Sequence, residues 1–212
     1  MLYKKIINDL ESIPNLKTKD VDRYNKKLIK EKTYVSEIGE YIMENQILHR
    51  TYFQVSLGLI KDTEKQFEFI EKNEDYLQDW WHTDQLIQFL KKPVDFDFAY
   101  RKAKEYINSE KTFTRRWGYV LFLAGLQKDK SHTKDILALM KDDDEYYVQM
   151  AQAWLICDLA VFNPKEVIEY IESCGLKYNI LGKAIQKMVD SYRISDEDKS
   201  YVKALRSKVK NN

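Results

Sequence analysis

Residues 146–166 read YYVQMAQAWLICDLAVFNPKE. Apolar side chains recur three and four positions apart through this stretch, as one face of an α-helix requires. They are Val148, Ala151, Leu155 and Leu159. Asn163, Pro164 and Glu166 then supply an N-cap, a proline at the first helical position and an early carboxylate. The stretch therefore predicts a helix that ends at about residue 161 and another that begins at about residue 165.

The rest of the chain repeats this helical pattern. Ser195 and Asp198 form a second capping pair, Pro93 interrupts the pattern, and Gly175 stands where the helix begun near Pro164 should end. Six glycines and three prolines in 212 residues leave little of the turn chemistry that sheets need, so the predicted class is all-α. The predicted helices cover residues 2–12, 18–32, 34–44, 46–59, 63–72, 79–90, 95–109, 112–126, 132–140, 144–161, 165–173, 178–190 and 196–208.

The order of these helices indicates how they assemble. Short joints favour antiparallel helix pairs, and from about residue 75 the pairs recur every 35 to 40 residues. That period is typical of HEAT-like repeats, which stack into an α-solenoid with a concave face. Periodicity alone is equally compatible with a compact, irregular helical bundle. A length of 212 residues favours one domain over residues 1–212.

Composition restricts the class of protein. Lysine and arginine number 35 against 34 acidic residues, for a net charge of +1. The longest uncharged apolar run, residues 117–126, is too short to cross a bilayer, so we expect a cytoplasmic protein with no membrane anchor. Cys157 and Cys174 form no CxxC motif, and the three histidines form no metal-binding pattern. We therefore expect reduced thiols, no metal, no cofactor and a monomer.

Two adjacent tryptophans do not fit a purely structural role. Neighbouring helical positions point about 100° apart, so one core cannot easily receive both Trp80 and Trp81. We expect at least one indole to face water or a ligand. Asp84 lies one helical turn further on, on the same side as the indoles. A solvated carboxylate beside an ordinary core tryptophan is the structural alternative.

Basic residues form two further groups. Arg115 and Arg116 lie near a helix start between Phe113 and Trp117, an arrangement suited to phosphate contact and stacking, although salt bridges are equally compatible with it. The last 32 residues carry eight basic side chains, Lys187 and Arg193 among them, against four acidic ones. That local excess is compatible with a nucleic-acid contact.

Trp154 lies on a second apolar side of its helix, beside Met150 and Cys157. Core packing and an exposed platform are both compatible with this pattern.

Four segments follow one another in the second part of the sequence. They are Trp80 to Asp84 (WWHTD), Phe113 to Val120 (FTRRWGYV), Tyr146 to Trp154 (YYVQMAQAW), and Ala184 to Lys187 (AIQK) with Ser191 to Arg193 (SYR). In this order they resemble the AlkD-like DNA alkylation repair family over residues 75–206, whereas residues 1–74 diverge from it. We therefore divide the predicted domain into divergent helices at 1–74 and family-like repeats at 75–208.

The resemblance implies a fold, a partner and an activity. The fold is a stack of HEAT-like repeats whose concave face holds duplex DNA. The activity is a DNA glycosylase that removes cationic alkylated bases such as 3-methyladenine and 7-methylguanine. By resemblance Asp84 is the catalytic residue and Trp80, Trp81 and Trp154 contact the substrate. By resemblance Arg116 contacts the DNA backbone, and from their charge and position we expect Arg115, Lys187 and Arg193 to bind DNA as well.

These residue types suit that chemistry. Cleavage of an N-glycosidic bond builds positive charge on the sugar, which a carboxylate such as Asp84 can stabilise. A cationic base leaves as a neutral molecule, so no general acid is required. Indole faces attract cations by about 0.5 to 2 kcal/mol. A HEAT-like scaffold that binds DNA or protein without catalysis is the alternative function.

Overall fold

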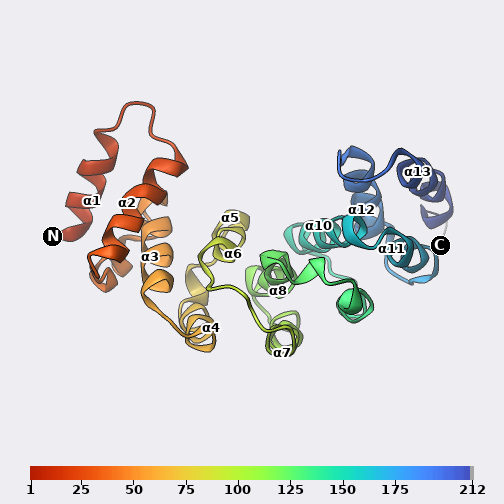
Figure 1. The fold of residues 1–212 in the computed structure, drawn as a ribbon, viewed down its shortest axis with the longest axis horizontal. Helices are drawn as coiled ribbons and strands as arrows, with labels where there is room; N and C mark the ends of the chain where they lie inside the picture. The colour runs from red at the N-terminus through yellow and green to blue at the C-terminus, as the bar shows by residue number, and fades with distance from the viewer. Residues whose placement is uncertain (211–212) are drawn as a thin grey trace. The chain divides into compact units, whose positions relative to one another are not determined.

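The computed structural model describes residues 1–210 (Figure 1). Within these residues the chain forms thirteen α-helices and five short 3-10 helices, and it contains no β-strand. The all-α prediction is confirmed. None of these helices is long and apolar enough to cross a membrane.

The helices gather into two compact units. The first covers Met1–Lys92, and the second begins at Pro93. The boundary lies where Pro93 breaks the helical pattern, because proline disfavours helix at the preceding residue. Packed helix pairs occur in the chain, as predicted, whereas the concave face and the extent of the domain stay predictions.

The first unit is organised around α3. This helix packs against α2, α1 and α6, and its Phe53, Val55 and Leu57 are fully buried. A buried polar link joins α2 to α3, since Asn25 Nδ2 donates to Gln54 Oε1 at 2.7 Å and its Oδ1 accepts from Thr51 Oγ1 at 2.9 Å. The elements are α1 (Leu2–Glu11), α2 (Thr18–Lys30), η1 (Ser36–Tyr41), α3 (Gln46–Leu59), α4 (Thr63–Lys72), η2 (Glu74–Tyr76), α5 (Trp80–Asp84) and α6 (Leu86–Phe89).

The second unit is organised around α10. This helix packs against α8, α11 and α12, which explains why it is apolar around most of its circumference. The largest fully buried side chains of the second unit are those of Trp117, Tyr119 and Phe122. The elements are α7 (Phe96–Tyr106), α8 (Thr112–Val120), η3 (Leu121–Ala124), η4 (Leu126–Lys128), η5 (Lys130–His132), α9 (Thr133–Leu137), α10 (Tyr146–Phe162), α11 (Pro164–Ser173), α12 (Tyr178–Asp190) and α13 (Asp196–Lys210).

Most predicted helix bounds are confirmed to within a few residues, and three predicted helices differ more. Residues 46–59, 63–72 and 178–190 are helical to the residue. The predicted helix at 34–44 is instead the 3-10 helix η1. The one at 79–90 is divided into α5 and α6 at Gln85. The one at 112–126 is α-helical only to Val120; it continues as the 3-10 helix η3 and stops at Gly125, which turns the chain at a φ of 124°.

Helix ends follow the predicted chemistry with one exception, the Asn163 side chain, which stands at the N-cap of α11 and makes no capping hydrogen bond. Asp198 N–H donates to Ser195 Oγ at 3.1 Å, which confirms that capping pair. Helix α11 begins at Pro164 and ends at Ser173, just ahead of Gly175, as predicted; Cys174 between them is extended. Burial raises the pKa of the Cys157 thiol to about 11, which keeps it protonated at neutral pH.

Gly118 marks the closest approach of α8 to the end of α7. A methyl group there would lie 2.7 Å from Ile107 Cγ2 and 3.1 Å from the Ile107 backbone nitrogen. We expect Gly118→Ala to destabilise the protein by roughly 1 to 3 kcal/mol, because backbone cannot yield cheaply. Thermal denaturation measures the change. Gly175→Ala is the matched control, since no atom lies within 4 Å of its added methyl group, and an equal loss there would contradict the packing argument.

Candidate active site

Helix α5 places Trp80, Trp81 and Asp84 at one surface of the first unit. It begins at Trp80, whose N–H donates to Asp79 Oδ1 at 2.7 Å. Trp80 is 48% exposed and Trp81 is half-buried, which confirms that at least one indole faces outward. Asp84 is also partly exposed, and the Thr83 hydroxyl lies 3.3 Å from its Oδ1.

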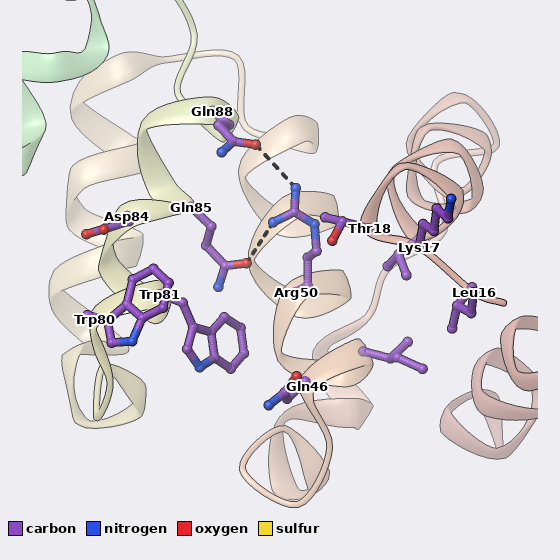
Figure 2. Close-up of a pocket in the computed structure, with 12 residues that line it drawn as sticks. Leu16, Lys17, Thr18, Gln46, Arg50, Trp80, Trp81, Asp84, Gln85 and Gln88 are labelled. Atoms are coloured by element: carbon purple, nitrogen blue, oxygen red, sulfur yellow. Dashed lines mark hydrogen bonds between the residues drawn. The ribbon is translucent and has the colours of Figure 1, made fainter. Parts of the chain in front are cut away.

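These three residues line one cavity of about 450 Å³ (Figure 2). Its walls come from the start of α2, from α3, and from α5 and α6. Figure 2 shows both indoles and Asp84 on the α5 side, and Arg50 on α3. A flat aromatic wall beside a carboxylate suits a positively charged, planar ligand.

Two buried histidines lie next to Trp81. The rings of His49 and His82 stack with centroids 3.7 Å apart, and Trp81 meets each ring edge-on. His82 Nδ1 accepts from the Gln78 N–H at 3.0 Å, so this nitrogen carries no proton. Burial, reinforced by His82, lowers the pKa of His49 to about 3, and burial lowers that of His82 to about 4. The pair is therefore neutral and gives Trp81 a rigid support.

Gln85 connects this support to Arg50. Its Oε1 accepts from Arg50 Nη1 at 3.2 Å, and its Nε2 lies 3.0 Å from His49 Nδ1. Arg50 Nε donates to Asp22 Oδ1 at 2.7 Å, and Nη2 donates to Gln88 Oε1 at 3.3 Å. Gln85, which directly follows Asp84, thus connects the start of α6 to α3.

In the second unit both predicted arginines of α8 have protein partners. Arg115 Nε forms a salt bridge with Asp143 at 2.8 Å, and its Nη1 donates to the carbonyls of Ser109 and Glu110. Arg116 is only 4% exposed, and its Nη1 donates to the Tyr147 carbonyl at 2.6 Å. For Arg115 the structure shows the salt bridge that the sequence left open as an alternative.

The other predicted residues of this unit lie on α10 and after α12. Trp154 is half-buried and shares a helix face with Asp158, one turn further on. Arg193 Nη1 pairs with Asp158 at 2.7 Å, and its guanidinium lies 5.3 Å from the Phe162 ring. Lys187, on α12, is partly exposed. One α10 face thus carries both Trp154 and the partner of Arg193.

The structure therefore brings Asp84, Trp80 and Trp81 together in the first unit, and it places the remaining predicted site residues in the second. Sequence reasoning missed Arg50, Gln85 and the histidine pair. Gln46 and Arg50 lie one turn apart on α3, but this spacing does not indicate that their face of the helix lines a cavity.

The family model described as DNA alkylation repair enzyme matches residues 7–188. The chain belongs to this family. The match begins well before residue 75, so it includes the helices whose sequence carries no recognisable motif. Neither the curated proteins nor the solved structures contain a significant match.

The histidine pair makes stability depend on pH. Histidines have a pKa near 6.5 in the unfolded chain, whereas His49 and His82 have a lower pKa in the folded protein. Below pH 6.5 the unfolded chain therefore binds more protons than the folded protein, which favours unfolding. We expect the free energy of unfolding to fall by roughly 1 to 2 kcal/mol per ring between pH 7 and pH 5. Urea denaturation at both pH values measures this loss.

Two variants test whether the histidine pair is the source of this pH dependence. His82→Asn should reduce the pH dependence, whereas His132→Gln, which removes a histidine from the second unit, should leave the loss attributable to the pair intact. An unchanged pH dependence in His82→Asn would show that the pair is not its source.

Proposed function

We propose that this protein is a DNA glycosylase that hydrolyses the N-glycosidic bond of cationic alkylated bases, such as 3-methyladenine and 7-methylguanine, in duplex DNA. Membership of the DNA alkylation repair enzyme family supports a role in alkylation repair. The observation that carries the finer proposal is the single cavity that joins Asp84 to two indoles.

In this proposal Asp84 is the catalytic residue. As the bond to the base breaks, positive charge develops on the sugar, and a nearby carboxylate stabilises it and orients the attacking water. The alkylated base already carries a positive charge and leaves neutral, so Asp84 needs no partner that donates a proton.

The tryptophans provide selectivity in the same proposal. Indole faces attract a cation by about 0.5 to 2 kcal/mol, depending on how far water is excluded. Trp80 and Trp81 would contact the charged lesion and its sugar in preference to a neutral nucleotide. Trp154, half-buried on α10, is the proposed third aromatic contact.

The proposed DNA contacts in the second unit are Lys187, Arg193, Arg115 and Arg116. Phosphate contacts supply affinity and orientation without reading sequence. Arg193 is exposed, Lys187 and Arg115 are half-buried, and Arg116 is buried. Arg115 and Arg116 already bind Asp143 and the Tyr147 carbonyl, so a contact with phosphate would have to share or exchange these partners.

The direct test is base release from methylated duplex DNA by the purified protein. We expect release of both 3-methyladenine and 7-methylguanine. Asp84→Asn should keep DNA binding and lower excision at least about tenfold, which corresponds to about 1.4 kcal/mol of activation free energy. Chromatography of the released bases and anisotropy of labelled duplex measure the two quantities.

Asp97→Asn, at an exposed carboxylate in the first turn of α7, is the matched control and should excise normally. Normal excision by Asp84→Asn would contradict the role of this carboxylate. A folded wild-type protein that binds DNA without releasing either base would support the noncatalytic scaffold instead.

A further inference from the structure

The cavity beside Asp84 also contains two cationic side chains to which no role has been given. Arg50 comes from α3 and Lys17 from the residue that precedes α2 (Figure 2). Together they outnumber the one carboxylate among the lining residues, Asp84. The cavity therefore combines aromatic, anionic and cationic surfaces, which a purely cationic ligand would not require.

The guanidinium of Arg50 is held in a fixed orientation. Asp22, Gln85 and Gln88 accept from Nε, Nη1 and Nη2 respectively, and the side chain is only 12% exposed. Its Cζ also lies over the Phe89 ring, 5.0 Å from the ring centroid. A guanidinium so held loses little entropy on binding a ligand.

Arg50 still has hydrogen-bonding capacity for that ligand. A guanidinium carries five N–H donors, and three of them have partners among residues 1–210. Two of its three partners are neutral amides, so only Asp22 offsets its charge. Lys17, just before α2, is the second cationic residue among those that line the cavity, and its ammonium group extends away from Arg50 (Figure 2).

We propose that Arg50, with Lys17, forms a phosphate-binding subsite for the DNA strand that carries the lesion, an inference that rests on the proposed function. A planar guanidinium with two remaining donors suits two oxygens of one phosphodiester. Arg50 on α3 and Lys17 at the start of α2 would hold the backbone while Asp84 and the indoles act on the sugar and base. Arg50 is then a binding residue of the same cavity, supplied by the divergent helices at 1–74.

The test is the salt dependence of DNA binding, measured by anisotropy of a methylated duplex between 50 and 200 mM salt. We expect Arg50→Gln to reduce the slope of log K against log salt by about one, because one phosphate contact is lost. Binding should weaken about tenfold and KM should rise, with kcat within about threefold of wild type. Arg50→Lys should keep the slope.

The Asp22→Asn variant tests whether Arg50 binds DNA or only holds α3 and α6 together. This variant removes the carboxylate charge that pairs with Arg50 and leaves the guanidinium in place. We therefore expect an unchanged slope of log K against log salt and equal or tighter DNA binding. If Arg50 only held α3 and α6 together, Asp22→Asn and Arg50→Gln would weaken binding alike with no change of slope, and the proposal would be overturned. Circular dichroism verifies that each variant is folded. If Arg50→Gln does not fold, the salt dependence of Arg50→Lys and Asp22→Asn still tests the proposal.

The same measurements distinguish a failure of the phosphate subsite from a failure of the proposed glycosylase function. A wild-type protein that excises methylated bases, together with an Arg50→Gln slope equal to wild type, would overturn the phosphate subsite alone. A folded wild-type protein that neither binds nor excises would overturn the proposed function and the subsite together.

Discussion

A buried polar connection between α3 and the α5–α6 segment is the constraint on which the candidate site depends. Gln85 contacts both His49 and Arg50, and His49 stacks on His82 in the next helix. Inside a protein, polar groups that lose their partners are costly, so this connection tolerates few alternative arrangements. It fixes the turn after Asp84 relative to α3. The position of the catalytic candidate is therefore set by side chains that would never touch a substrate.

The second unit rests on a different constraint, the burial of α10. Val148, Ala151, Leu155 and Leu159 are fully buried, and neighbouring helices cover several sides of the helix. Because close packing forbids large voids, these neighbours must follow its shape. Salt bridges and charge-assisted hydrogen bonds then complete the assembly at its ends, through Arg115, Arg116 and Arg193. Basic residues whose pattern indicates DNA contact thus also hold helices together, and one side chain can serve both roles only where part of it stays exposed.

Much of the fold and half of the first-unit site could be predicted from sequence. Helical spacing and capping residues are local, so the bounds of α3, α4 and α12 follow directly from them. The adjacency of Trp80, Trp81 and Asp84 is also local, since it needs only one helical turn. The contribution of Arg50 could not be predicted, because Asp22, Gln85 and Gln88 lie far from it in sequence. The same holds for His49 and His82, which look scattered until the helices pack.

By itself the amino-acid sequence determined the helical class, most helix ends and the cluster on α5, because each depends on neighbours within one or two turns. It also carries the family resemblance, which the match over residues 7–188 extends into the divergent helices. Only the tertiary structure decided which cations line the cavity and which partner each cation takes. A side chain's partners depend on packing between distant segments, and spacing along one helix contains no information about that packing.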